Sequence, residues 1–299
     1  MKTLVADIGG TNSRLAIAIT SRQDKEITLK NIHKFRNSDF NNFDEVIKRY
    51  LSISDERSIS RMCIAAAGII SDTTVEMSNL NWKITVPSLQ KTAKIDEVFI
   101  INDLQAQGYA LDFIEPNDLE ELIEGSYSKG PNDTKLVCGM GTGFNVAIAY
   151  QTAFGTFVPA SEYGHARTTT ANEKQKMILK KLEENSSFVS YENILAGPGL
   201  NRLDQVLNQR KDRTPSDILS AAQEGDFKAK EVGSQLAGFA GQAFGDFALM
   251  NMALGGVYLI GGVARAIMPY LKEENFKQNF YDRGNFSEIM KKISVYLIL

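Results

Sequence analysis

The first twenty residues of the chain, MKTLVADIGGTNSRLAIAIT (residues 1–20), contain the pattern that decides the fold. The apolar run at residues 4–6 predicts a buried strand that ends at Asp7. Gly9-Gly10 permit a tight reversal, because glycine adopts positive φ at little cost, and a second apolar run follows. A hairpin turn that offers backbone amides, a hydroxyl and one carboxylate suits phosphate and a metal ion. An ordinary hairpin needs the same glycines, so this stretch alone leaves both interpretations open.

Length, composition and charge indicate a globular protein. The chain has 299 residues, is 43% hydrophobic and carries a formal net charge of −3, which allows one large domain or two ordinary ones. It has no basic block, no apolar run of about 20 residues and no signal peptide. We therefore expect no nucleic-acid or membrane partner and a cytoplasmic location.

The cysteines and histidines do not form a metal-binding pattern. Cys63 and Cys138 lie in apolar, strand-like runs, so both are expected to be reduced and buried. Together with His33 and His165 they are too few and too scattered for a structural zinc site.

Strands alternate with helices in the first third of the chain. Apolar runs predict strands at residues 27–35, 61–67 and 97–101, and an amphipathic pattern predicts a helix at residues 41–51. This alternation predicts an α/β domain. Asn102 and Asp103 follow the third of these strands, at the sheet edge where α/β proteins bind ligands. Asp is also a common helix cap, which is the structural alternative for Asp103.

Residues 135–150, KLVCGMGTGFNVAIAY, repeat the opening hairpin. Gly141-Thr142 stand 131 positions after Gly10-Thr11, and each pair is followed by a similar apolar strand. The repeat suggests a duplicated domain whose two hairpins face a cleft, although a chance match of common residues is the alternative. On this alignment Asp7 corresponds to Cys138, so only the first hairpin offers a carboxylate to a metal ion.

Several later segments allow either a functional or a structural interpretation. Glu162 and His165 lie in a polar segment that contains a glycine, typical either of a binding loop or of a solvated one. Glu192 precedes a Gly-Pro-Gly turn. Gly261-Gly262 follow a buried strand, where glycine permits a close ligand or tight packing. Residues 227–254 form a long pattern rich in Ala and Gly, which favours a buried core helix. The sequence contains no P-loop motif and no G-x-G-x-x-G motif.

Seven segments in this order resemble the bacterial glucokinase family, within the sugar kinase, Hsp70 and actin ATPase fold: ADIGGTN, MSNLNW, INDLQAQ, GMGTGFNVA, SEYGH, YENILAGPGL and LGGVYLIGG. The cysteine-rich zinc motif of the related repressor and open-reading-frame kinase group is missing from the sequence, which indicates the zinc-free proteobacterial type. Asn145 stands where the family commonly has a small residue, and we expect it to be tolerated because Asn accepts positive φ.

The resemblance implies an α/β fold of two ribonuclease H-like (actin-like ATPase) domains around a central cleft. The small N-terminal domain would cover residues 1–110 and the large domain residues 111–299. Family members continue into a final helix that returns to the small domain, whereas this sequence stops at Leu299. We expect lower stability or activity than in a relative that carries this helix.

The resemblance also implies ATP-dependent phosphorylation of glucose at the 6-hydroxyl, a step of glycolysis that gives glucose 6-phosphate and ADP. Two alternatives remain open. The first is a kinase for mannose, fructose or an N-acetylated amino sugar. The second is a non-catalytic sugar-binding or regulatory protein on the same fold.

The family motifs assign a role to each matching residue. Asp103 would be the general base. The sugar would be bound by Asn79, Asn102, Asp103, Glu162, His165 and Glu192. ATP would be bound by Asp7, Gly9, Gly10, Thr11, Asn12, Gly141, Thr142, Gly143, Gly261 and Gly262. Asp7 would lie near Mg²⁺, with water between them, and the protein would be a homodimer.

Overall fold

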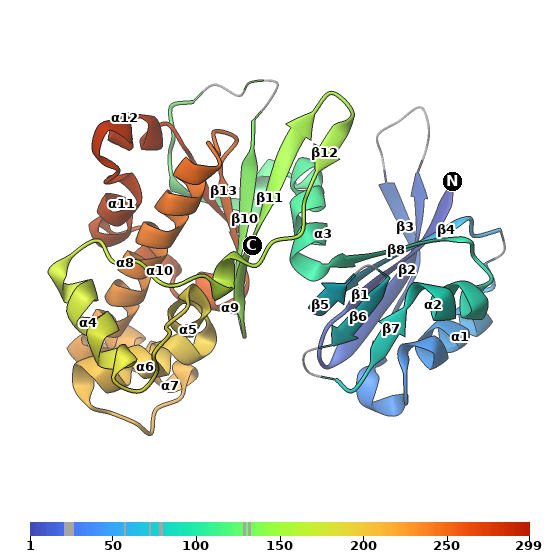
Figure 1. Ribbon diagram of the computed structural model, residues 1–299, viewed down its shortest axis with the longest axis horizontal. Helices are drawn as coiled ribbons and strands as arrows, with labels where there is room; N and C mark the ends of the chain where they lie inside the picture. Colours follow the sequence, from blue (N-terminus) through green and yellow to red (C-terminus); the bar gives the residue numbers. More distant parts are fainter. Residues whose placement is uncertain (21–26, 57, 72, 78–79, 128–129, 131–132) are drawn as a thin grey trace. The chain divides into compact units, whose positions relative to one another are not determined.

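The computed structural model describes residues 1–20, 27–56, 58–71, 73–77, 80–127, 130 and 133–299. Within them the chain forms two compact units, Met1–Ala106 and Gln107–Leu299, referred to below as the first and second units. Each unit is built on its own mixed β-sheet (Figure 1). No helix of the described part of the chain has the length and apolar character needed to cross a membrane.

The first unit contains a five-stranded sheet in the order β3-β2-β1-β4-β8. β1 pairs antiparallel with β2, and β2 with β3, whereas β1-β4 and β4-β8 are parallel. The elements are β1 (Lys2–Ile8), β2 (Asn12–Thr20), β3 (Ile27–Arg36), α1 (Phe43–Ser54), β4 (Arg61–Ala66), α2 (Val86–Ala93), β8 (Glu97–Asn102) and α3 (Asp103–Ala110), which continues into the second unit. The opening hairpin and the strands predicted at residues 27–35, 61–67 and 97–101 are confirmed.

Helix α1 supplies much of the core of this unit. Asn42 caps its first turn, because the Asn42 side chain accepts a hydrogen bond of 3.0 Å from the Glu45 amide. Apolar side chains at helical spacing then face the sheet, and four of them are buried: Phe43, Val46, Ile47 and Tyr50. The helix predicted at residues 41–51 is therefore confirmed, and it extends to Ser54.

A second, three-stranded sheet was not predicted. It consists of β5 (Gly68–Ser71), β6 (Thr74–Met77) and β7 (Lys83–Thr85), joined as an antiparallel meander. These strands have three or four residues each, too few for an alternating pattern to be recognised. Asn79 lies outside the described residues.

The second unit contains a six-stranded sheet in the order β12-β11-β10-β13-β14-β9. Its strands are β9 (Leu119–Ile123), β10 (Lys135–Met140), β11 (Phe144–Thr152), β12 (Gly155–Phe157), β13 (Val257–Ile260) and β14 (Val295–Ile298). Its helices are α4 (Glu173–Glu183), α5 (Tyr191–Leu195), α6 (Gly197–Asn208), α7 (Pro215–Gln223), α8 (Phe227–Met250), α9 (Gly262–Ala266), α10 (Met268–Leu271), α11 (Glu274–Tyr281) and α12 (Ser287–Met290). Single 3₁₀ turns lie at Asn37–Asp39, Leu111–Phe113, Pro116–Asp118, Tyr163–His165 and Gly284–Phe286.

The two sheets share one topology. In each, a hairpin and a third antiparallel strand (β1-β2-β3 and β10-β11-β12) are followed by two parallel strands on the other side (β4-β8 and β13-β14). The second sheet adds β9 at its edge, antiparallel to β14. The duplicated ribonuclease H-like organisation is thus present in the strand order as well as in the sequence.

The register corrects the residue alignment of the two hairpins. Ile8 pairs with Ser13 across a turn of four residues, whereas Met140 pairs with Phe144 across a turn of three. The second turn is therefore one residue shorter, and Asp7 corresponds to Gly139 rather than to Cys138. The burial pattern agrees with this alignment. The residues directly before and after Asp7 in β1 lie in the core of the first unit, and those directly before and after Gly139 in β10 lie in the core of the second unit. The first hairpin alone carries a carboxylate at this position, as predicted.

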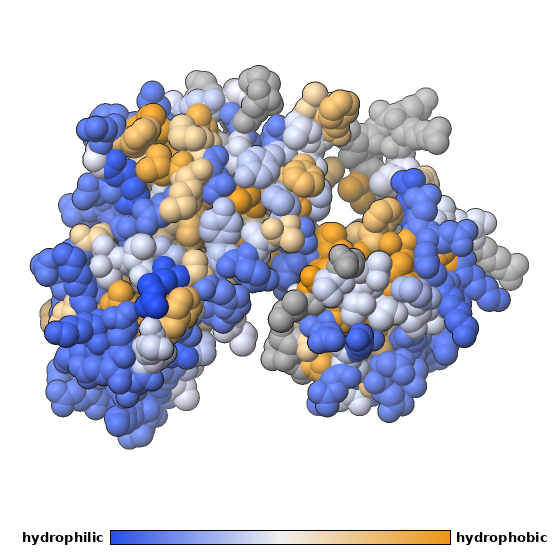
Figure 2. All heavy atoms as spheres, in the orientation of Figure 1, coloured by the Kyte–Doolittle hydropathy of each residue, from blue (hydrophilic) through white to orange (hydrophobic). Residues whose placement is uncertain are grey.

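Helix α8 is the buried core helix that its composition indicates. Its glycines allow neighbouring segments to approach closely: a Cβ at Gly241 would overlap the backbone of Phe276 in α11, and one at Gly233 would overlap the Tyr270 ring. The helix ends at Met250, four residues before the end of the pattern. Hydrophilic side chains cover α4, α6 and α7, whereas apolar side chains are visible among the strands of the first unit (Figure 2).

Both cysteines are free thiols. Cys138 is buried, whereas Cys63 is only partly buried because it lies in β4 on the sheet face away from the core of the first unit. The expectation of burial therefore holds for Cys138 alone.

Candidate active site

The first glycine turn is held by a residue that the sequence analysis missed. The turn closes with a hydrogen bond of 3.0 Å from the Gly9 amide to the Asn12 carbonyl. Asn37, which is 2% exposed, donates from Nδ2 to the Gly9 carbonyl (2.8 Å) and from its backbone amide to the Thr11 carbonyl (2.9 Å). Its Oδ1 accepts from the Ser13 hydroxyl (2.7 Å). Thr11 itself is exposed, so its hydroxyl is available to a ligand.

Asp7 and Arg14 form a charged pair at the end of this hairpin. The two residues are opposite each other in the β1-β2 register, and Arg14 Nη1 lies 3.1 Å from Asp7 Oδ2. Both side chains are more than half exposed, so the pair adds little stability. It places a carboxylate and a guanidinium next to the glycine turn. The sequence contains Arg14 in the GGTNSR segment, but only the register shows that it faces Asp7.

The end of β8 brings Asn102 and Asp103 to the same sheet edge. Asn102 is level with Ala66 in β4, which in turn is level with Ile8 in β1. Asn102 acts as the helix cap, because its Oδ1 accepts from the Leu104 amide at 2.9 Å while Gln105 Oε1 accepts from the Asn102 amide at 2.9 Å. The N-cap of α3 is therefore Asn102, and the helix begins at Asp103.

The Asp103 carboxylate lies in a partly desolvated position. Burial raises the pKa of this carboxyl above its ordinary range, the hydrogen bond from the Leu104 amide (2.8 Å) opposes the shift, and the negative charge of Asp7 adds to it. A carboxylate with a raised pKa at the carboxyl edge of a sheet has the character of a general base.

The second glycine turn is in direct contact with Glu192. The turn closes with a bond of 2.9 Å from the Gly141 amide to the Gly143 carbonyl. Glu192 Oε2 accepts a hydrogen bond of 3.0 Å from the Phe144 amide, and a Cβ at Gly143 would lie only 2.8 Å from the same oxygen. Glu192 thus lies against the turn, 48 residues away in sequence. A Cβ at Gly141 would meet nothing within 4 Å, and Thr142 is exposed.

Glu162 directly precedes a single 3₁₀ turn and His165 is its last residue, with Glu162 Oε2 3.9 Å from His165 Nε2 and both side chains more than half exposed. Asn145 of β11 holds this turn. Its Nδ2 donates to Glu162 Oε2 (3.1 Å), and its Oδ1 accepts from the Gly164 amide (3.1 Å). Asn145 is paired with Gly139 in the strand and does not have positive φ. The reason expected for Asn at this position is therefore wrong: its side chain, not its backbone conformation, is used.

The two glycines after β13 differ in their surroundings. Gly261 has φ 108°, and a Cβ there would overlap the Met140 backbone, so tight packing requires this glycine. A Cβ at Gly262 would meet nothing within 4 Å. Of the two interpretations left open by the sequence, packing applies to Gly261, and Gly262 has the open space that a ligand would need.

Each unit therefore assembles part of the predicted set. The first unit places Asp7, the Gly9–Asn12 turn, Asn102 and Asp103 at one edge of its sheet. The second unit joins the Gly141–Gly143 turn to Glu192, and Glu162 to His165.

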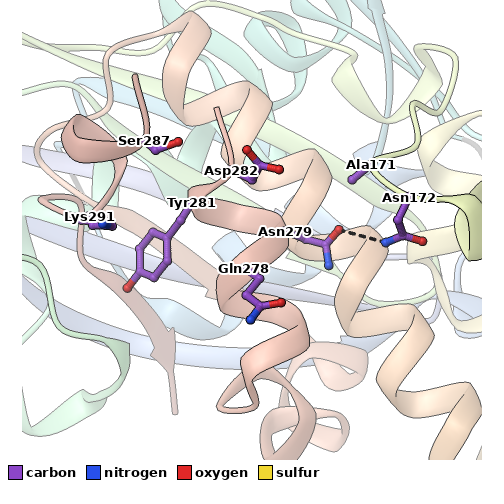
Figure 3. A pocket seen from close by; sticks show the side chains of 8 residues that line it. All are labelled: Ala171, Asn172, Gln278, Asn279, Tyr281, Asp282, Ser287 and Lys291. Atoms are coloured by element: carbon purple, nitrogen blue, oxygen red, sulfur yellow. Dashed lines mark hydrogen bonds between the residues drawn. The ribbon is translucent and has the colours of Figure 1, made fainter. Parts of the chain in front are cut away.

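A separate polar pocket of about 510 Å³ lies elsewhere in the second unit (Figure 3). It is bordered by the start of α4, by α11 and α12, and by Lys291. None of the predicted site residues lines it; the lining residues are Ala171, Asn172, Gln278, Asn279, Tyr281, Asp282, Ser287 and Lys291.

Two sheets of one topology, each with a Gly-Thr turn between the strands of its hairpin, define a protein of the actin-like ATPase fold, which includes the ATP-dependent sugar kinases. The glucokinase family model matches residues 4–299. The chain is 30% identical over 302 residues to the glucokinase of Saccharophagus degradans, covering 99% of this chain and 93% of that protein.

A second glucokinase, from Rhizobium etli, is 31% identical over 306 residues, covering 99% of this chain and 86% of its own length. The crystal structure of a glucokinase from an Antarctic psychrotroph superimposes with a TM-score of 0.90 at 28% identity, covering 100% of this chain and 94% of that one. The chain belongs to the glucokinase family, and the curated relatives it matches are of proteobacterial origin.

Proposed function

We propose that this protein transfers the γ-phosphoryl group of ATP to the 6-hydroxyl of glucose and that Asp103 is the general base. Glucose kinase activity follows from membership of the glucokinase family. The observation that supports the assignment of the base is the position of Asp103, at the carboxyl end of β8 in a desolvated environment that raises the pKa of its carboxyl.

The proton transfer requires a carboxylate that is held in place and is ionised at neutral pH. The Leu104 amide fixes one oxygen of Asp103 with a bond of 2.8 Å. As the sugar oxygen attacks the γ-phosphorus, the proton of the 6-hydroxyl passes to this carboxylate, and ADP leaves with the bridging oxygen. Phosphoryl transfer depends mainly on positioning and on neutralisation of phosphate charge, so one base and a fixed phosphate site are sufficient.

The phosphates of ATP are assigned to the two glycine turns. The first turn offers Gly9, Gly10, Thr11 and Asn12, and Asn37 keeps this turn in shape through its bonds to Gly9 and Thr11. The second offers Gly141, Thr142 and Gly143. Arg14 adds a guanidinium beside the first turn, where it can neutralise phosphate charge. Gly262 is assigned to the adenosine end, because the space around its Cα is open.

Mg²⁺ is the metal that this chemistry uses to neutralise phosphate charge. The exposed carboxylate of Asp7 fits that ion, since oxygen ligands and retained water are what Mg²⁺ prefers. We assign Asp7 to the hydrated ion. The pairing of Asp7 with Arg14 holds the carboxylate at the turn.

The sugar hydroxyls are assigned to Asn79, Asn102, Glu162, His165 and Glu192, in addition to Asp103. Asn102 has its Oδ1 bonded to the Leu104 amide, so its Nδ2 is the atom expected to meet a hydroxyl. Asn145 orients the Glu162 carboxylate, and the Phe144 amide orients that of Glu192. Carboxylates held in this way accept hydrogen bonds from hydroxyls in fixed directions.

A coupled assay of ADP release across glucose, mannose, fructose and N-acetylglucosamine tests the function. We expect glucose to give the highest kcat/KM and Asp103→Asn to abolish the sugar-dependent signal. Sugar-dependent turnover that persists in Asp103→Asn would refute the base, and a higher kcat/KM for another hexose would refute the substrate.

Two further proposals come from the family resemblance. We propose that the enzyme is a homodimer and that it acts in the cytoplasm. Light scattering of the purified protein tests the first, with a mass of twice 33.1 kDa as the expected result. Fractionation of the source cells tests the second.

A further inference from the structure

We propose that a hydroxyl relay formed by Tyr191, Thr169 and Asp246 positions the sugar-binding carboxylate of Glu192. The inference rests on the proposed function, because it concerns a residue assigned to the sugar. It adds three positioning residues from three separate segments of the second unit: α5, the stretch before α4, and α8.

The direction of the relay follows from its hydrogen bonds. Thr169 Oγ1 donates to Asp246 Oδ2 (3.1 Å) and lies 2.9 Å from Tyr191 Oη. Because the single hydroxyl proton of Thr169 is given to the carboxylate, the Tyr191 phenol must donate to Thr169. Burial raises the pKa of Tyr191, so the phenol keeps the proton that this arrangement needs.

Asp246 is a fixed end point for the relay. Its Oδ1 lies 3.0 Å from Nε of Arg283, whose side chain is 6% exposed, and its Oδ2 also accepts from Gln242 Nε2 at 3.0 Å. Arg283 is held in turn by the backbone, since Nη1 donates to the Asn279 carbonyl (2.9 Å) and Nη2 to the Gln242 carbonyl (2.6 Å). Two hydrogen bonds and one ion pair therefore hold the Asp246 carboxylate in place.

The other end of the relay is the helical turn that carries Glu192. Tyr191 is the first residue of α5 and Glu192 the second, and the Glu192 carbonyl accepts from the Ala196 amide (3.2 Å). The Tyr191 amide donates to the Ala166 carbonyl (3.0 Å). α5 has only five residues, so its orientation depends on such external contacts rather than on its own hydrogen bonds.

The segment that carries Glu162 and His165 is attached to the same place. It runs on through Ala166 to Thr169, and the rings of Tyr163 and Tyr191 both pack edge-on against Phe247, with centroids 5.0 and 5.1 Å away. Phe247 directly follows Asp246 in α8. One turn of α8 therefore supports the neighbours of Glu162 and of Glu192, the two carboxylates assigned to the sugar.

The test compares Tyr191→Phe, Thr169→Val and Thr169→Ser with the parent enzyme. Tyr258→Phe is the matched control, because it removes another buried phenol of the second unit, one whose hydroxyl bonds only to the Gly255 carbonyl in the described contacts. Thermal unfolding of every variant is recorded beside KM for glucose, KM for ATP and kcat.

We expect KM for glucose to rise about threefold to tenfold in Tyr191→Phe and Thr169→Val, the factor that corresponds to one net hydrogen bond. KM for ATP should change less than twofold, and Thr169→Ser should restore KM for glucose because it restores the hydroxyl. Combining Tyr191→Phe with Thr169→Val should be no worse than Thr169→Val alone, since both changes interrupt one relay.

Unchanged KM for glucose in both variants, failure of Thr169→Ser to rescue, or a fall in melting temperature without a change in KM would overturn the proposal. A parent enzyme that phosphorylates no hexose would refute the proposed function instead. In that case the relay is tested by the hydrogen-exchange rate of the Ala196 amide. This rate should be several-fold faster in Thr169→Val than in the parent and unchanged in Tyr258→Phe.

Discussion

Replacing Asp103 by Asn isolates the chemical role of the carboxylate from its structural role. The amide oxygen of Asn can still accept the bond from the Leu104 amide, which is 2.8 Å long in the parent, so the start of α3 is retained. What is lost is the ability to take a proton. General-base catalysis contributes about 100-fold to 10,000-fold, so kcat should fall by that factor, equivalent to about 2.7–5.4 kcal/mol. KM for glucose should change only a few-fold.

The stability of this variant should move in the opposite direction. Burial and the charge of Asp7 raise the pKa of the Asp103 carboxyl in the folded state, so the folded protein binds this proton more tightly than the unfolded chain does. Ionised Asp103 therefore destabilises the fold at pH values above its folded-state pKa. This cost decreases as the pH falls from the folded-state pKa towards the lower unfolded-state pKa and is absent below the latter. Asp103→Asn should melt at the same or a higher temperature than the parent at pH 7.5, with a smaller difference at acid pH.

Steady-state kinetics and thermal unfolding between pH 4.5 and 8 measure both effects on the same samples. The raised pKa also predicts that kcat/KM of the parent declines on the acid side at a pH above the ordinary range of an aspartate. A variant that keeps kcat within tenfold of the parent would refute Asp103 as the base. A variant that melts well below the parent at pH 7.5 would show that the carboxylate is needed for folding.

Three further substitutions test separate parts of the second unit. Gly262→Ala should leave the melting temperature unchanged, because its Cβ enters open space, and should raise KM for ATP, because that space is assigned to the nucleotide. Gly261→Ala should instead lower the melting temperature. Equal KM for ATP in Gly262→Ala and the parent would remove Gly262 from the nucleotide site. Phe244→Ala, at a fully buried position, should lower the free energy of unfolding in urea by about 3–5 kcal/mol, and a loss below 1 kcal/mol would contradict the core assignment of α8. Asp246→Ala should cost about 3–5 kcal/mol in the same measurement, because it leaves the guanidinium of Arg283 buried and unpaired; a loss typical of an exposed pair, below 1 kcal/mol, would contradict this.

Most of the element order could be predicted, because it depends on local patterns. The strands of both hairpins, α1 and the strand that ends before Asp103 follow from apolar periodicity. The prediction failed where the pattern is short or ambiguous. The strands β5 to β7 have too few residues to show alternation, and the end of α8 is marked by no proline or glycine immediately after Met250.

The candidate site likewise has a part that local sequence patterns predict and a part that they do not. Gly10-Thr11, Gly141-Thr142 and Asp103 could be named from sequence, because the Gly-Thr pair is repeated, Asp103 follows a predicted strand, and all of them lie in segments that resemble the glucokinase family. The partners that hold them could not. Asn37 contacts Gly9 from 28 residues away, Glu192 contacts the amide of Phe144 from 48 residues away, and Thr169 contacts Asp246 from 77 residues away.

The sequence by itself therefore determined the class of fold, the duplicated glycine turns and the carboxylate that follows β8, since each depends on residues close together in the chain. Only the tertiary structure decided that Asp7 corresponds to Gly139, that Arg14 faces Asp7, and that Gly261 is needed for packing while Gly262 is open. The physical reason is strand register. A shift of one residue moves a side chain to the other face of a sheet, and register is set by the packing of the whole unit rather than by any single stretch.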